Sequence, residues 1–531
     1  MSFAKTHSGQ SYFLKGQIID IEVDLSRGLH SFNIVGLPDA SVGEAKDRIS
    51  AAIKNTGFVS PKQKNHRVVI SLAPAHVRKE GTHFDLALAV GYLLASGDMS
   101  FDPTEKLFVG ELSLDGNVRK VSGVLAIVLE AKKRGFKEFF VPKENVQEAA
   151  LVEDVKIFGA STLCEVVDHL DPKNAREIKK NTDTVRTKIL EHVRAGNAQD
   201  RLQKNSGENF QETKLISLEK IIGQNLAKRG LEIAAAGGHN VIMSGPPGTG
   251  KTMLANALRS LLPKLNLDHA LEVTSIHSIA GLTLDLISHP PFRAPHHTSS
   301  YPSLVGGGAI PRPGEITLAH RGVLFLDEFP EFDKKVIETL RQPLEDHVVH
   351  IARAKGSAYF PAHFILVAAM NPCPCGYYTS KKNKCICSPL DIGRYKKKIS
   401  GPILDRIDIS VEVGDIEYAD FDKAPENTKN ETDLALRRIA GARERQRERF
   451  INIKNGPNLN GEMGGSDLSL VSNISKEASE VLLQSAKTFN LSMRSYHRVW
   501  KVARTIADIE NSDEITKEHI LEALQFRKVG N

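Results

Sequence analysis

Eight residues near the middle of the chain leave few folds open to it: Gly245-Pro246-Pro247-Gly248-Thr249-Gly250-Lys251-Thr252. They match the phosphate-binding pattern G-x-x-x-x-G-K-[ST]. An apolar run at 241–243 is typical of a buried strand, and residues 253–258 continue as the first turns of a helix. Glycines let backbone N–H groups close around phosphate oxygens, and the helix that follows points its positive end at the anion. The pattern predicts a P-loop, in which Lys251 reaches the β- and γ-phosphates of ATP and the Thr252 hydroxyl binds Mg²⁺.

Two later strands supply the other groups that nucleotide hydrolysis needs. Residues 323–327 predict a buried strand that ends at Asp327 and Glu328, the Walker B arrangement. We expect Asp327 to hold Mg²⁺, directly or through water, and Glu328 to polarise the attacking water. Residues 364–369 predict a third strand, which places Asn371 at the carboxyl end of the sheet, where ligands bind in open α/β folds. Asn371 either positions that water or caps the strand end.

Bulk composition narrows the class of protein. A chain of 531 residues has room for about three domains. Its hydrophobic fraction of 41% and charged fraction of 25% are ordinary. With no bilayer-length apolar stretch and no signal-peptide pattern, we expect a cytoplasmic protein without a membrane partner. A net charge of +6 permits nucleic-acid binding but does not argue for it.

Composition also suggests four segments along the chain. We expect a domain of alternating strands and helices at 1–170, a polar linker at 171–214, the nucleotide-binding α/β domain at 215–412, and a mostly helical domain at 413–531. Within them the pattern predicts strands at 66–72 and 106–112, and helices at 85–94, 475–489, 496–509 and about 516–526. The mixed charges at 443–449 favour a solvated, self-paired helix face.

Four of the five cysteines crowd into fifteen residues. Cys373, Cys375, Cys385 and Cys387 form a C-x-C…C-x-C pattern. In a cytoplasmic protein a four-thiol cluster favours metal over disulfides, and Zn²⁺ bound by four thiolates is the simplest candidate. Four reduced thiols in a loop and a reversible disulfide remain open alternatives.

A basic β-hairpin is predicted just before the Asn371 strand. Its strands run through 349–353 and 359–360, with a tip near 354–357. Arg353 and Lys355 would follow a nucleic-acid backbone, and Tyr359 could stack on a base. An ordinary surface hairpin with solvated charges is the alternative. Further back, His296 and His297 allow a metal site or, as we favour, a loop that contacts a neighbouring subunit.

Several segments carry a family resemblance, at 32–38, 292–298, 306–308, 311–315, 371–376 and 401–408. With the motifs above, they resemble the AAA+ ATPases of the magnesium-chelatase-like group, and specifically the ComM/YifB branch, over essentially the whole chain. The resemblance implies an α/β fold: an AAA+ P-loop NTPase core with a C-terminal helical lid. It also implies a ring, expected to be a homo-hexamer, with ATP at subunit interfaces and the hairpin entering a central pore.

The resemblance assigns two arginines to the nucleotide. Arg406 resembles an arginine finger presented to the γ-phosphate of the neighbouring subunit, which would stabilise the transition-state charge. A local ion pair with Asp405 or Asp408 is the alternative. Arg494 resembles the sensor-2 arginine of the lid, expected to contact the γ-phosphate of its own subunit, with Arg498 as the runner-up.

The N-terminal segment resembles the α+β Lon proteolytic domain, a ribosomal S5 domain 2-like fold, at residues 109–116 and 141–145. Lon-type proteolysis needs a serine nucleophile and a lysine base. The serine-bearing segment corresponds to residues 81–85, which contain no serine, and the lysine position falls near Leu125. We therefore expect a protease fold without protease chemistry.

Three functions are compatible with these features. The resemblance most strongly implies an ATP-driven DNA translocase or helicase that promotes branch migration in recombination or natural transformation. The alternatives are a motor subunit of a magnesium chelatase and a protein unfoldase or chaperone. ATP hydrolysis is common to all three.

Overall fold

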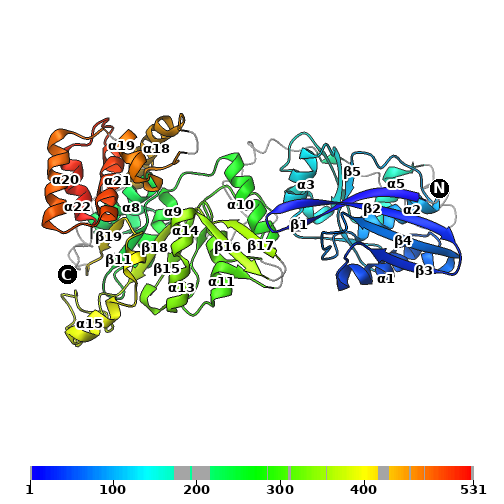
Figure 1. Cartoon of the computed structure of the whole chain (residues 1–531), viewed down its shortest axis with the longest axis horizontal. Helices are drawn as coiled ribbons and strands as arrows, with labels where there is room; N and C mark the ends of the chain where they lie inside the picture. The colour runs from blue at the N-terminus through cyan, green and yellow to red at the C-terminus, as the bar shows by residue number, and fades with distance from the viewer. Residues whose placement is uncertain are drawn as a thin grey trace. The chain divides into compact units, whose positions relative to one another are not determined.

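The computed structural model describes residues 3–172, 192–193, 216–283, 285–308, 312–353, 356–415, 430–453, 456–471 and 473–527. The described chain forms two compact units (Figure 1). Unit 1 comprises residues 1–208 and 266–288, and unit 2 comprises 209–265 and 289–531. Most of the predicted linker at 171–214 lies outside the described residues.

Unit 1 contains two four-stranded sheets. In the first, the order is β1 (Phe3–Tyr12), β2 (Lys15–Arg27), β4 (His66–Ala73) and β3 (Ser31–Val35). In the second, it is β10 (His192–Val193), β9 (Lys156–Ala160), β8 (Glu138–Pro142) and β5 (Lys106–Phe108). The helices are α1 (Ala40–Asn55), α2 (Asp85–Ser96), α3 (Val124–Lys133), α4 (Val146–Ala149) and α5 (Leu163–Leu170). The apolar side of the first sheet packs with α1 and α2 in one buried core.

Two of the three secondary-structure elements predicted in unit 1 are confirmed. The strand predicted at 66–72 and the helix predicted at 85–94 are confirmed as β4 and α2. The strand predicted at 106–112 is interrupted into β5 and β6 (Glu111–Leu112), and β6 pairs instead with β7 (Val118–Arg119). The interruption arises at Gly110, whose N–H bonds the His83 carbonyl and whose own carbonyl accepts from Leu86, outside the second sheet.

Unit 2 is built on a parallel five-stranded sheet. Its order is β12 (Phe292–Arg293), β15 (Val323–Leu326), β18 (Ile365–Met370), β11 (Val241–Ser244) and β19 (Ile409–Glu412). The three middle strands are almost wholly buried, which explains their continuous apolar runs. Helices α8 (Asn225–Gly237) and α9 (Lys251–Leu261) pack against each other in the same core. The α/β fold with a parallel sheet is confirmed.

A helical region follows the sheet in unit 2. It contains α18 (Glu431–Phe450), α19 (Gly465–Val471), α20 (Lys476–Thr488), α21 (Met493–Ile509) and α22 (Lys517–Gln525). The three predicted C-terminal helices are confirmed as α20, α21 and α22, and α21 begins three residues earlier than expected. Ser475 and Ser492 accept hydrogen bonds from N3 backbone N–H groups, so each caps the start of its helix.

The expectation of a solvated, self-paired face on α18 holds only in part, because Arg447 and Glu444 are exposed and paired at 3.6 Å whereas Arg443 and Arg449 bond other helices. Arg443 donates from Nε and Nη2 to the Ala235 carbonyl of α8, and burial lowers the pKa of Arg443 to about 10. Arg449 binds both carboxylate oxygens of Asp508 at 3.0 and 2.5 Å. The charges of α18 therefore hold this helix to α8 and α21.

Helix α10 (Leu267–Ile279) belongs to unit 1, although its sequence lies inside the segment expected to form the ATPase domain. The Ser278 hydroxyl accepts from the Gly123 N–H at 3.1 Å and donates to the Glu148 carboxylate. Glu148 also accepts from the Leu125 N–H at 3.0 Å, and burial raises the pKa of Glu148. The helix thus completes a buried polar cluster at the start of α3.

The remaining α-helices and strands of unit 2 come between the strands of its sheet in the sequence. They are α11 (Tyr301–Val305), β13 (Gly306–Gly307), β14 (Arg312–Pro313), α12 (Glu315–Leu318), α13 (Lys334–Thr339), α14 (Arg341–Asp346), β16 (Val348–Arg353), β17 (Gly356–Pro361), α15 (Pro389–Lys396) and α16 (Gly401–Leu404). None of the helices described combines the length and apolar composition that crossing a lipid bilayer requires.

Candidate functional site

The P-loop joins β11 to α9 in unit 2. Gly248 and Gly250 have φ values of 77° and 89°, which other residues rarely adopt. A Cβ on Gly245 would lie 2.1 Å from the Val413 carbonyl oxygen, so only glycine fits there. Lys251 Nζ donates to the carbonyls of Gly245 and Pro246 at 2.7 and 2.8 Å. The loop therefore has the open backbone that a phosphate chain requires.

The electrostatics of Lys251 suit an anionic ligand. Burial lowers the pKa of its ammonium group, and the carboxylates of Asp327 and Glu328 act in the opposite direction. A bound phosphate chain would supply further negative charge next to a cation that is 9% exposed.

The Walker B acids lie across the sheet edge from the start of α9. Thr252 Oγ1 donates to Asp327 Oδ2 at 3.2 Å, so a hydroxyl and a carboxylate converge as hard oxygen ligands suited to Mg²⁺. Glu328 has a φ of 51°, and its carboxylate lies 3.2 Å from His297 Nδ1. The histidine therefore contacts the acid that follows Asp327, although the Glu328 side chain is 53% exposed.

Asn371 follows β18 and approaches the P-loop from the neighbouring strand. Its Oδ1 lies 3.3 Å from Lys251 Nζ. The turn that follows Asn371 packs on the P-loop itself, because a Cβ on Gly376 would come within 2.8 Å of Pro247. Asn371 and Pro247 thus tie the segment after β18 to the nucleotide cradle.

The two arginines assigned by the family resemblance meet at one carboxylate. Arg406 Nη2 bonds Glu345 Oε2, and Arg494 Nη2 lies 3.7 Å from Glu345 Oε1. Arg406 also donates to the Pro402 carbonyl at 2.8 Å, and its Nε is buried without a partner among the described residues. The local pair that the sequence suggested with Asp405 or Asp408 is replaced by the contact with Glu345.

Arg498, the runner-up for the sensor-2 role, is committed elsewhere. It donates to the carbonyls of Leu404 and Ile407 at 2.9 and 2.6 Å, and to Asp405 at 3.1 Å. These bonds close the turn that carries Arg406. Arg498 therefore acts as a positioning residue for that turn.

The predicted hairpin is confirmed as β16 and β17, paired from Val348↔Pro361 to Arg353↔Gly356. Val349, Ile351 and Phe360 are buried, whereas Tyr359 is 68% exposed and stacks on His350 with ring centroids 4.6 Å apart. The hairpin thus has one anchored face and one exposed aromatic face. Lys355 and the Arg353 side chain lie outside the described residues.

The four clustered cysteines converge in space. Sγ atoms of Cys373 and Cys375 are 3.4 Å apart, Cys385 Sγ lies 3.7 and 3.6 Å from them, and the four sulfurs fall within 4.8 Å of one another. Backbone N–H groups of Tyr377 and Ile386 lower the pKa of Cys375 to about 6. The N–H of Cys375 favours the Cys387 thiolate, but desolvation and the neighbouring sulfurs outweigh it and raise the pKa of Cys387 to about 12. All four sulfurs can be thiolates at this distance only if a cation between them offsets their mutual repulsion, so the arrangement fits a metal site.

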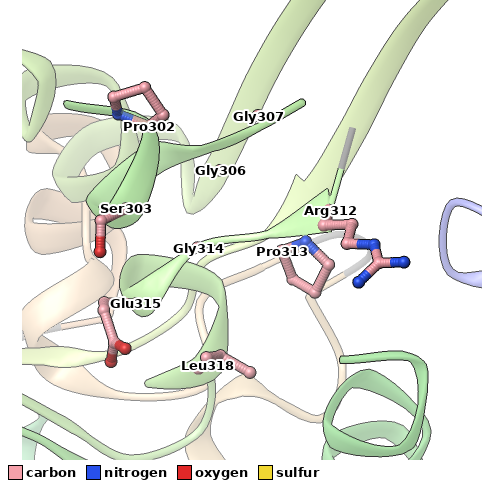
Figure 2. Close-up of a pocket in the computed structure, with 9 residues that line it drawn as sticks. All are labelled: Pro302, Ser303, Gly306, Gly307, Arg312, Pro313, Gly314, Glu315 and Leu318. Atoms are coloured by element: carbon pink, nitrogen blue, oxygen red, sulfur yellow. The ribbon is translucent and has the colours of Figure 1, made fainter. Parts of the chain in front are cut away.

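The insertion before Walker B folds around a separate open cavity of about 380 Å³ (Figure 2). It is lined by Pro302, Ser303, Gly306, Gly307, Arg312, Pro313, Gly314, Glu315 and Leu318, none of them from the P-loop. Glu315 forms a bidentate ion pair with Arg293 at 2.6 and 2.7 Å, which fixes the start of the insertion. His296 Nδ1 contacts the Thr298 hydroxyl at 2.8 Å, so the two histidines of this segment have different partners.

The positions that would carry Lon-type chemistry hold other groups. Thr82 Oγ1 donates to the Glu111 carboxylate at 2.5 Å, and Leu125 is buried. A hydroxyl bonded to a carboxylate lacks the lysine base of that mechanism.

Three contacts of this site could not be read from the sequence: those of His297 with Glu328, of Glu345 with both arginines, and of Arg498 with its turn. The histidine had a signal, since His297 follows the strand next to Walker B. Glu345 had none, because nothing distinguishes it from Asp346, the other acid of its short helix.

Comparison with known proteins covers nearly the whole chain. The family described as magnesium chelatase, subunit ChlI, matches residues 217–421, subunit ChlI of Mg-chelatase matches 21–145, and its C-terminal region matches 429–527. Competence protein ComM of Haemophilus influenzae is 40% identical over 99% of this chain and 98% of its own length. The uncharacterised protein YifB of Escherichia coli is 38% identical over 100% and 98%. DNA repair protein RadA of Streptococcus pneumoniae is 34% identical over 91 residues, which are 17% of this chain and 21% of RadA.

Proposed function

Because the chain belongs to the magnesium-chelatase-like AAA+ family that includes ComM and YifB, we propose that it is an ATP-hydrolysing ring motor acting on DNA. The specific activity we propose is DNA translocation or helicase action that promotes branch migration in recombination or natural transformation. We place this motor in the cytoplasm, as a homo-hexamer with ATP and Mg²⁺ at the subunit interfaces.

The convergence of four groups at one edge of the sheet carries the proposal of ATP hydrolysis. Lys251 and Asn371 lie 3.3 Å apart, and Thr252 and Asp327 lie 3.2 Å apart. In this arrangement residues 245–252 would hold the phosphates, and Thr252 and Asp327 would hold Mg²⁺, which would neutralise charge on the phosphates. Glu328 would accept the proton of the attacking water, and Asn371 would orient that water.

Arg406 and Arg494 would serve the same nucleotide. Both reach Glu345, so a segment that presents Arg406 to the neighbouring subunit would bring Arg494 with it. We therefore assign Arg494 to the neighbour's γ-phosphate, rather than to that of its own subunit as the sequence suggested. Glu345 would release both guanidinium groups when the more highly charged γ-phosphate of ATP binds.

DNA as the substrate is supported by the hairpin and by one relative. The exposed Tyr359–His350 stack offers a surface for bases, and Arg353 and Lys355 would contact phosphates. The relative at 40% identity is named a competence protein. The chelatase-type motor is favoured only by the family description, and a protein unfoldase is the other alternative.

The remaining sequence assignments complete the proposal. We propose that Cys373, Cys375, Cys385 and Cys387 bind a structural Zn²⁺, because their sulfurs lie within 4.8 Å of one another. We also propose a Lon-like domain at 1–170, a linker at 171–214, an ATPase domain at 215–412 and a lid domain at 413–531, except that residues 266–288 fold with the first of these. The Lon-like domain serves assembly or binding.

Steady-state ATP hydrolysis with and without single-stranded and forked DNA tests the function. We expect DNA to stimulate the wild type, and Lys251→Ala to lower kcat by about 10²-fold or more, because a preorganised cation at the transferring phosphate is lost. Lys264→Ala, at an exposed lysine of the same unit, should leave the rate unchanged. If DNA has no effect while an unfolded protein raises the rate, the chain is an unfoldase.

A further inference from the structure

A compact segment of unit 2 holds the charge excess of the entire chain. We call residues 373–398, which contain the four cysteines and α15, the thiol knuckle. It carries seven lysine and arginine side chains against one aspartate: Lys381, Lys382, Lys384, Arg394, Lys396, Lys397, Lys398 and Asp391. Its net charge of +6 equals that of all 531 residues, so the rest of the chain is neutral.

The thiol cluster fixes the shape of this basic segment. The Cys375 N–H lies 3.4 Å from Cys387 Sγ, so the two C-x-C pairs face each other. The eleven residues between Cys373 and Cys385 include few buried side chains. The cluster therefore holds Lys381 and Lys384 in place, whereas Lys396 and Lys397 lie at the end of α15, which the buried Ile392 and Tyr395 anchor. Figure 1 shows α15, in yellow, standing out from the rest of unit 2.

Most of the knuckle's cations are available to an outside partner. Lys381, Lys384, Lys396 and Lys397 are exposed and form no ion pair with a described residue. Lys398 differs, because it binds the Glu331 carboxylate at 2.9 and 3.0 Å. Unneutralised lysines on a rigid, projecting surface favour an extended polyanion as the partner.

Exposed apolar side chains accompany these lysines. Tyr378 is 55% exposed, Ile386 87% and Leu390 74%. An aromatic ring next to lysines is the combination that binds single-stranded nucleic acid, through base stacking and phosphate contacts. The aliphatic side chains would also suit an anionic membrane, and sedimentation with lipid vesicles distinguishes membrane binding from DNA binding.

We propose that the thiol knuckle is a second DNA-binding site, separate from the β16–β17 hairpin. Its lysines bind the phosphate backbone, and Tyr378 stacks on an unpaired base. The inference rests on the proposed action on DNA, and it adds a contact outside the hairpin expected to enter the pore.

The knuckle is joined directly to the nucleotide site. Cys373 lies two residues after Asn371, which reaches Lys251, and Gly376 packs on Pro247 of the P-loop. DNA held by the knuckle would therefore act on the strand end that positions the attacking water. This connection gives DNA stimulation of ATP hydrolysis a physical route.

The test compares two variants that lose equal charge. The knuckle variant replaces Lys381, Lys384 and Lys397 by Ala, and the control variant replaces Lys334, Lys335 and Lys476 of the same unit, which are exposed and form no ion pair within the described part of the chain. Fluorescence anisotropy measures their affinity for labelled single-stranded and forked DNA over a range of salt concentrations. We expect the knuckle variant to bind single strands about 10- to 100-fold more weakly at 0.1 M salt, with a salt slope smaller by about 2. ATP hydrolysis without DNA should be unchanged.

A second pair of variants tests stacking. Tyr378→Ala should weaken single-strand binding by about fivefold or more, and Tyr378→Phe should restore it because the ring is kept. If Tyr378→Ala and Tyr378→Phe lose the same affinity for single strands, the ring does not stack on a base.

The outcomes separate this inference from the proposed function. If the wild type binds no DNA, both fail. If it binds DNA and the knuckle and control variants match it equally, the knuckle is not a DNA site while the motor stands. Knuckle-dependent sedimentation with phosphatidylserine vesicles, without a DNA effect, would assign the surface to membranes and overturn the inference.

Discussion

Replacing Arg498 by Ala tests whether this residue works through Arg406. Its Nη1 donates to the carbonyls of Leu404 and Ile407 at 2.9 and 2.6 Å, on both sides of Arg406. Without these bonds the turn should loosen, although no group that touches the nucleotide has been removed. The variant should therefore behave as a weakened form of Arg406→Ala.

The contacts set the size of the effect. A hydrogen bond from a charged donor contributes about 1.5–3 kcal/mol. The Asp405 carboxylate is 40% exposed, so that ion pair adds little, and the two carbonyl bonds dominate. Allowing for water that replaces them, a net loss of up to about 3 kcal/mol lowers the population of the ordered turn by at most about 100-fold. We expect kcat to fall about 10- to 100-fold, less than the roughly 10³-fold expected for Arg406→Ala.

A double-mutant cycle is the assay. The kcat and KM for ATP are measured for the wild type, Arg498→Ala, Arg406→Ala and the double variant, at concentrations where size-exclusion chromatography shows equal assembly. The double variant should match Arg406→Ala, with KM changed by less than about twofold, because the two residues act as one unit. Arg437→Ala, at an exposed arginine of α18, is the matched control and should be silent. A raised KM in Arg498→Ala, with effects that multiply in the double variant, would show that Arg498 contacts the nucleotide and would refute the reasoning.

Two further predictions concern the metal and pH. Elemental analysis of purified protein should find about one Zn per chain. The Cys385→Ser variant should lose this zinc, because three thiolates and a hydroxyl bind Zn²⁺ less well than four thiolates. A wild-type protein without metal would contradict the zinc site. Glu462 accepts from His363 at 2.5 Å and, although burial opposes ionisation, this contact lowers the pKa of Glu462 to about 2. A depressed carboxyl pKa stabilises the fold above the unfolded value of about 4.3, and this contribution disappears as the pH falls towards 2. As the pH falls through this range, the free energy of unfolding measured in urea should therefore decrease by up to about 3 kcal/mol more in the wild type than in Glu462→Gln. Parallel pH profiles of the two proteins would contradict the assignment.

The elements of the fold and site that a local residue pattern determines could be predicted from the sequence. The P-loop, the Walker B strand and the Asn371 strand are continuous apolar runs beside glycine or acidic residues, and parallel strands bring such residues to one edge of the sheet. The close spacing of Cys373 and Cys375 likewise limited where a metal could lie.

Contacts between distant segments were beyond the reach of pattern. The charges at 443–449 look like a solvated face, yet Arg443 bonds a carbonyl 208 residues away. Glu345 meets Arg406 across 61 residues, between two short helices with no distinctive periodicity. Which of several acids receives an arginine depends on tertiary placement, which periodicity does not encode.

The crossing of α10 into unit 1 restricts how the protein can be divided. A fragment cut within 171–214 would keep α3 but lose Ser278, leaving the Gly123 N–H without its acceptor and the Glu148 carboxylate with one donor fewer. A buried group stripped of its partner costs about 1–3 kcal/mol. Truncated versions for crystallography or expression should therefore carry residues 266–288 grafted through a short loop, since the gene's linear halves do not correspond to the folded ones.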